Sequence, residues 1–185
     1  MRKGAIQDSE KMYRASFGMI RFMHDNALLR ALVDPVKLLR ELGVRENQAV
    51  FEVGAGPGFY TVGASRAVGA SGRVWAFEVN PYACAYLEAK LARRGIKNVI
   101  VKNINASASG LADSSIDFAF VTGVPYVVGG VDSLLAELAR VLKPGGILAY
   151  RSRRTSGLSS PEGLEPLGLR FEEIRKQFLI IKKSV

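Results

Sequence analysis

The sequence is poor in the residues that build disulfides, metal sites and nucleophilic triads. Its 185 residues include one cysteine, Cys84, and one histidine, His24. An internal disulfide is therefore excluded, and neither a metal site with the usual ligand spacings nor a Ser-His-Asp triad has support. No apolar run approaches the length of a membrane span, and residues 1–10 lack the apolar core of a signal peptide. We therefore expect a cytoplasmic protein.

Positive charge is concentrated toward the two ends of the chain. The net charge is +9, and residues 139–185 carry ten basic side chains against four acidic ones. Residues 1–48 carry nine against six, whereas residues 49–138 are balanced. A basic tail can attract nucleic acid or another polyanion, although an ordinary solvated surface has the same composition. Arg151, Arg153 and Arg154 at the end of a predicted strand could also dock an acidic acceptor or a phosphate.

The stretch from residue 49 to residue 68 is the most informative part of the chain. Residues 50–53 are mostly apolar and suit a buried strand, and residues 59–68 can form a helix. Between them lie three glycines at alternate positions, Gly54, Gly56 and Gly58. Glycine can take positive φ and lets the backbone approach a ligand closely. The stretch therefore predicts a strand, a ligand-binding turn and a helix.

The spacing of these glycines disagrees with a nicotinamide cofactor. The dinucleotide fingerprint G-x-G-x-x-G would place its third glycine at position 59, which is Phe59 here. Glu52 also lies two residues before the first glycine, where a carboxylate would repel a bound pyrophosphate. A cationic ligand without phosphate fits these residues better.

Two further motifs follow in order. A second predicted strand, residues 73–78, ends in Glu78, which lies 20 residues after Gly58, the spacing at which a carboxylate meets ribose hydroxyls. Residues 140–146 read Arg-Val-Leu-Lys-Pro-Gly-Gly and lead into a predicted strand at residues 147–151. Other strands are expected at residues 99–104, 116–121, 169–174 and 177–183, and other helices at residues 9–31, 35–42, 82–94 and 132–142.

The acidic glycine motif, Glu78 and the Lys-Pro-Gly-Gly turn together resemble the class I S-adenosylmethionine-dependent methyltransferases. The Lys-Pro-Gly-Gly turn is similar to that of the ubiquinone and menaquinone biosynthesis group, and the resemblance covers roughly residues 36–150. It implies an α/β fold of Rossmann-like type: a doubly wound, seven-stranded sheet, mostly parallel with a C-terminal antiparallel hairpin, and helices on both faces. Residues 1–185 would form one domain, in which an N-terminal helical cap (residues 1–46) precedes the core (residues 47–185).

The resemblance implies S-adenosylmethionine as the cofactor and S-adenosylhomocysteine as its product. The expected cofactor-binding residues are Glu52, Gly54, Ala55, Gly56 and Gly58 for the methionine end, Glu78 with the adjacent Val79 for the ribose, Asn105 and Ala106 for the adenine, and Thr122 at the tip of the fourth strand. Related enzymes usually carry an acid where this chain has Asn105. An amide oxygen can accept the same hydrogen bond from the adenine amino group.

The residues that would act on the acceptor are harder to identify. Tyr126 follows the fourth strand, where ligands of open α/β sheets collect, and Tyr13 and His24 lie in the N-terminal segment. Each could serve as a general base, which is needed only if the acceptor arrives protonated. Each could equally be a packing or surface residue.

The expected function is methyl transfer to a small-molecule acceptor. A tRNA or rRNA acceptor remains the alternative because of the basic tail, and a non-catalytic cofactor-binding subunit is a further one. The sequence does not determine the oligomeric state.

Overall fold

A seven-stranded sheet forms the centre of the protein. The computed structural model describes residues 17–18, 33–124, 127–151 and 163–185. The strands run in the order β3-β2-β1-β4-β5-β7-β6, of which the first five are mutually parallel, while β7 is antiparallel to both β5 and β6. The strands are β1 (Ala49–Val53), β2 (Arg73–Glu78), β3 (Val99–Asn103), β4 (Ile116–Thr122), β5 (Leu142–Arg151), β6 (Leu169–Arg175) and β7 (Phe178–Lys183). The predicted fold class is confirmed.

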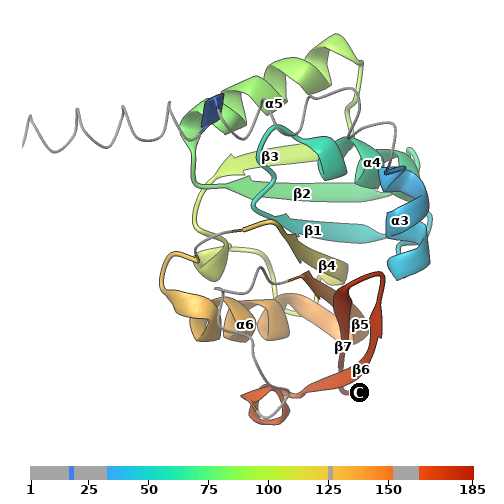
Figure 1. The fold of residues 1–185 in the computed structure, drawn as a ribbon, viewed down its shortest axis with the longest axis vertical. Coiled ribbons are helices and arrows are strands. Elements are labelled where there is room, and N and C mark those ends of the chain that lie inside the picture. Colours follow the sequence, from blue (N-terminus) through green and yellow to red (C-terminus); the bar gives the residue numbers. More distant parts are fainter. Residues whose placement is uncertain (1–16, 19–32, 125–126, 152–162) are drawn as a thin grey trace, which may run out of the picture.

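Helices cover both faces of this sheet (Figure 1). The helices are α3 (Pro35–Leu42), α4 (Phe59–Val68), α5 (Pro81–Arg93) and α6 (Gly130–Val141), with short 3-10 turns η1 (Ala106–Ala108) and η3 (Glu165–Leu167). Side chains alternate along each strand, so Val50 packs with α3 and α4, whereas Phe51 and Val53 pack with α6 on the other face. Helix α5 packs against β2 and β3.

Local capping explains where two of the helices begin. The carboxylate of Asp34 accepts hydrogen bonds from the N–H groups of Val36 and Lys37 at 2.9 and 3.1 Å. Asn80 caps α5 in the same way. Each cap is followed by a proline at the first helical position. Proline lacks an N–H group, but no hydrogen bond is lost because the N–H at this position has no partner within the helix. The predicted start of the helix after Asp34 is confirmed.

The fifth strand begins earlier than the sequence predicts. Proline and paired glycines usually mark a loop, so residues 142–146 were expected to precede the strand. Instead Leu142 pairs with Ile116 and Ile147 pairs with Phe118, with an irregularity in the register between these two pairs. The Pro-Gly-Gly sequence is thus accommodated inside β5, and Gly145 takes a φ of +78° there.

The hairpin of β6 and β7 contacts α3, the helix that precedes β1. Its two turn residues, Lys176 and Gln177, both have positive φ, at 51° and 67°, as a two-residue turn between twisted strands requires. Arg175 Nη1 donates to the carbonyl oxygen of Glu41 in α3 at 2.9 Å, and Lys176 forms an ion pair with the Glu41 carboxylate at 3.4 Å. The hairpin is therefore tied to α3.

Most of the predicted N-terminal cap lies outside the described residues. Within it, Phe17 and Gly18 are helical, and the ring of Phe17 lies 5.5 Å from that of Tyr86 in α5. None of the helices in the described ranges is long and apolar enough to cross a membrane.

Close packing of α3 on α4 gives a test of the fold. A Cβ atom on Gly63 would lie 2.7 Å from Cβ of Pro35 and 3.1 Å from its carbonyl carbon. We expect Gly63→Ala to lower the free energy of unfolding by about 1 to 3 kcal/mol, despite the higher helix propensity of alanine. Urea unfolding followed by circular dichroism measures this. Gly18→Ala is the control, because a Cβ there meets no described atom within 4 Å; an equal loss in both variants would contradict the prediction.

Candidate functional site

The loop after β1 requires glycine at each of its three glycine positions. Gly54, Gly56 and Gly58 have φ values of +75°, +52° and +79°, a region that side chains with a Cβ rarely adopt. A Cβ on Gly54 would also overlap Val124, and one on Gly58 would overlap Leu87. The loop is therefore held in close contact with the segment after β4 and with α5.

The backbone donors of this loop are already used within the protein. Gly54 and Ala55 both donate their N–H groups to the carbonyl oxygen of Phe77, at 2.8 and 3.1 Å, and Gly56 donates to Glu78 Oε2 at 2.9 Å. The N–H of the third glycine is bonded to a carbonyl within the loop, and the remaining loop residue is a proline. The loop between its first and third glycines offers no free amide to a phosphate, in agreement with the glycine spacing.

Glu78 lies at the carboxyl end of β2 and is held rigidly. Its Oε2 accepts from Gly56, and its Oε1 accepts from the N–H of Asn80 at 2.8 Å. Asn103 Nδ2 donates to the carbonyl oxygen of Glu78 at 2.9 Å. Each carboxylate oxygen keeps a further lone pair, which could accept a ribose hydroxyl. The loop and the carboxylate thus form one hydrogen-bonded unit.

A small cleft opens beside this unit at the carboxyl edge of the parallel strands. Cofactors of open α/β sheets bind at such an edge. The cleft brings together five of the predicted residues, Gly54, Glu78, Val79, Asn105 and Ala106, with seven apolar neighbours, Val53, Phe77, Ile104, Val124, Val127, Val128 and Leu134. Of the described residues predicted to bind the cofactor, the remaining ones do not line it: Glu52, Ala55, Gly56, Gly58 and Thr122.

Three large apolar side chains are left exposed around the cleft. Val79, Ile104 and Val128 are 40%, 38% and 42% exposed, and only two other large apolar residues in the described ranges are comparably exposed. A flat apolar ring placed between them would remove this surface from water. No local sequence pattern marks Ile104 or Val128, because their exposure depends on strands that lie far apart in the chain.

Asn105 supports the backbone next to the cleft. Its Oδ1 accepts from the N–H of Ser107 at 3.0 Å, and its Nδ2 donates to the carbonyl oxygen of Val128 at 3.1 Å. The side chain therefore caps η1 and connects it to the segment before α6. One lone pair of Oδ1 is still available, so an adenine contact remains a prediction.

Glu52 is more deeply buried than the sequence suggests. It is 2% exposed, and its Oε2 has no hydrogen-bond partner among the described residues. Burial raises the pKa of this carboxyl to about 8; the Thr61 hydroxyl opposes the rise, and the negative charge of Glu78 adds to it. Glu52 therefore holds its proton at neutral pH. The prediction of a charged carboxylate at this position is therefore wrong, because burial keeps the carboxyl neutral.

The three predicted acceptor-site residues cannot be placed. Tyr126, Tyr13 and His24 all lie outside the described residues. Within the described ranges, no three His, Cys, Asp or Glu side chains come together as a metal ion would require.

The sheet order and the cleft at its carboxyl edge define the class, which is that of Rossmann-like S-adenosylmethionine-dependent methyltransferases. The chain belongs to the methyltransferase domain family, whose pattern it matches over residues 51–150. This confirms the resemblance inferred from the three motifs and the cofactor it implies.

Individual relatives agree with this class. A crystal structure of a SAM-dependent methyltransferase from Aquifex aeolicus is 30% identical, with a TM-score of 0.74, and the match covers 91% of this chain and 98% of that one. A ubiquinone/menaquinone biosynthesis C-methyltransferase of Klebsiella pneumoniae is 36% identical over 57% of this chain and 43% of its own length. A demethylmenaquinone methyltransferase of Geobacillus stearothermophilus is 28% identical over 60% and 47%. The chain thus spans less than half the length of these two curated relatives.

Burial of Glu52 predicts an unusual dependence of stability on pH. The unfolded carboxyl loses its proton near its ordinary pKa of 4.5, whereas the folded one keeps it until about pH 8. The folded state therefore loses stability as pH rises through this range, and the loss levels off above pH 8. We expect Glu52→Gln, which cannot ionise, to be more stable than the wild type by up to about 5 kcal/mol at pH 9, with little difference near pH 4.5.

Chemical denaturation at pH values from 4.5 to 9 measures this difference. Glu88→Gln is the matched control, because Glu88 is an exposed glutamate of α5, and its profile should follow that of the wild type. Parallel profiles for Glu52→Gln and the wild type would show that Glu52 is ionised in the folded protein.

Proposed function

We propose that this protein transfers a methyl group from S-adenosylmethionine to a small planar acceptor. The observation that carries the proposal is the cleft in which the Glu78 carboxylate faces exposed apolar side chains. A carboxylate suits ribose hydroxyls and an apolar slot suits adenine, while the loop has no free amide for a phosphate. A single domain over residues 1–185 and a cytoplasmic location belong to the same proposal.

In this proposal the protein's own residues position the donor. Glu78 would hold the ribose, the slot formed by Val79, Ile104 and Val128 would hold the adenine, and the glycine loop would lie against the methionine end. The nucleophile's electron pair forms a bond to the methyl carbon, and the electron pair of the broken carbon–sulfur bond stays on sulfur. The sulfonium is already electrophilic, so alignment and exclusion of water are the main contributions of the protein.

A small acceptor is favoured over RNA by the state of the basic tail. Arg170 forms an ion pair with Glu172 at 2.6 Å, and Arg175 forms one with Glu173. Lys176 is paired with an acid of α3. Cations that are already paired with acids are less available to phosphates. The two curated relatives are named for menaquinone and ubiquinone biosynthesis, which supports a quinone-like ring as the first acceptor to test.

Cofactor binding is tested by calorimetric titration with S-adenosylhomocysteine. We expect Glu78→Gln to weaken binding about 10- to 100-fold, because it replaces a charged acceptor of hydrogen bonds by a neutral amide. Glu88→Gln, an exposed glutamate of α5 outside the cleft, should bind like the wild type. Equal binding by Glu78→Gln and the wild type would remove the ribose role of Glu78. Absence of binding by the wild type would overturn the proposed function.

Methyl transfer itself is tested with labelled S-adenosylmethionine and two acceptors, a short-chain demethylmenaquinol and total tRNA, at 50 and 200 mM salt. We expect label in the quinol product and a kcat/KM that changes by less than about twofold between the two salt concentrations. An RNA acceptor bound through six or more phosphates would instead lose about 10³-fold or more in affinity. Labelled RNA with that salt dependence would contradict the small-molecule proposal, and transfer to either acceptor would exclude a non-catalytic role.

A further inference from the structure

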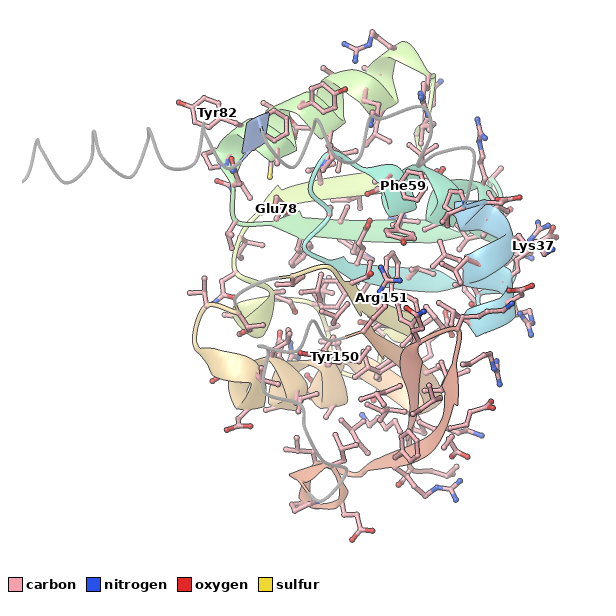
Figure 2. The ribbon with its side chains drawn as sticks, in the orientation of Figure 1. Lys37, Phe59, Glu78, Tyr82, Tyr150 and Arg151 are labelled. Atoms are coloured by element: carbon pink, nitrogen blue, oxygen red, sulfur yellow. The ribbon has the colours of Figure 1, made fainter. Side chains whose placement is uncertain are left out.

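Arg151 lies against an aromatic ring at the carboxyl edge of the sheet. It ends β5 (Figure 2). Its guanidinium carbon lies 5.0 Å from the ring centroid of Phe178 in β7. A cation–π contact attracts the guanidinium to the ring without using any of its N–H groups as hydrogen-bond donors. Arg151 is therefore held in position by a contact that uses none of its hydrogen-bond donors.

No described residue offers Arg151 an acceptor. It forms neither a hydrogen bond nor an ion pair within the described ranges, whereas Arg140, Arg170 and Arg175 each contact a carboxylate. The N–H groups of Arg151 therefore have no acceptor among the described residues and could donate to a ligand. The neighbouring Arg153 lies outside the described residues.

A second unsatisfied donor lies beside Arg151. Thr122 of β4 is the register partner of Arg151, so the two residues lie on adjacent strands and on the same face of the sheet. Thr122 is 8% exposed, and its buried hydroxyl has no hydrogen-bond partner among the described residues. Glu52 of β1 lies on this face as well, because its partner Phe120 is two residues from Thr122. The acid on this face is protonated and does not supply a counter-charge.

This pair of donors lies at the same carboxyl edge of the sheet as the cofactor cleft, whereas Val53 and Phe77 of the cleft lie on the opposite face. Thr122 is followed two residues later by Val124, which lines the cleft and contacts the glycine loop. Aromatic rings continue the same face, since Tyr60 of α4 lies 6.4 Å from Phe120. A planar molecule placed here would meet the cofactor at the carboxyl ends of β4 and β5, where a transferable group is delivered.

We propose that Arg151 and Thr122 bind an oxyanion of the methyl acceptor, either a carboxylate or an ionised phenol, on a planar ring. The fork of the guanidinium suits two oxygens or one strongly charged one, and the threonine hydroxyl adds a further donor. A carboxylate would be anchored away from the reacting atom. A phenol would instead have its pKa lowered by the nearby positive charge and lose its proton to water, so that it reaches the methyl group as an anion without a general base. The role as acceptor site rests on the proposed methyl transfer.

Two probes that differ only in charge test the site, 2-naphthoate and its neutral amide 2-naphthamide, titrated with and without S-adenosylhomocysteine. We expect the wild type to prefer the anion by about tenfold or more and Arg151→Gln to lose this preference while its affinity for the amide is unchanged. Arg151→Lys should retain part of the preference, since it keeps the charge but not the planar fork. Thr122→Val should weaken naphthoate binding severalfold. Arg170→Gln, which removes an exposed cation of β6, is the control and should match the wild type.

The absorbance of bound 2-naphthol separates the two sources of the oxyanion. A lowered naphthol pKa in the wild type, lost in Arg151→Gln, would indicate a phenol, whereas a naphthoate preference alone would indicate a carboxylate. A wild type that prefers neither anion, or an Arg151→Gln variant that keeps both preferences, would overturn the proposed site. Binding of S-adenosylhomocysteine is measured separately in the Arg151 and Arg170 variants and should stay within about twofold of the wild type. Its failure in the wild type would reject the methyltransferase function, while the naphthoate comparison still decides whether Arg151 binds an anion.

Discussion

The hydrogen bonds between the glycine loop and the end of β2 are the constraint on which the cofactor edge depends. Two consecutive loop amides share the carbonyl oxygen of Phe77, and a third reaches the carboxylate of Glu78. These bonds extend the parallel pairing of β1 and β2 beyond the ends of the strands. They also fix Glu78 and the loop relative to one another, so that a ligand meets a preformed surface. Close contact with Val124 then joins this surface to the end of β4.

Local sequence signals were sufficient for most of the fold. The helix at residues 59–68 and the strand at residues 73–78 have the predicted bounds, because their apolar periods and glycine or acidic ends are local features. The early start of β5 could not be predicted, since it depends on pairing with β4 across an irregular register. The apolar slot was missed for a related reason. Whether Ile104 or Val128 is exposed depends on which distant segment lies opposite, and no local pattern encodes that.

The state of individual charged side chains also could not be predicted from the sequence, because it depends on the folded environment of each one. Counting residues treats all cations and all acids alike, and so suggested a uniformly basic tail and a charged Glu52. Folding distinguishes among them. Several tail cations acquire acidic partners, burial protonates Glu52, and Arg151 contacts a ring and has no counter-ion among the described residues. The net charge does not distinguish these three cases.

The position of the last strand in the sheet has a consequence for how the molecule forms. Although β7 is last in sequence, it lies between β5 and β6 and contributes Phe178, Ile180 and Ile181 to the core. During synthesis, β5 has no antiparallel partner until residue 183 has left the ribosome. At about 5 to 20 residues per second, the roughly 30 residues after β5 take a few seconds to appear. During that interval β5 is an unpaired edge of the sheet. Such an edge can pair with another chain, so the nascent chain is exposed to aggregation at this stage.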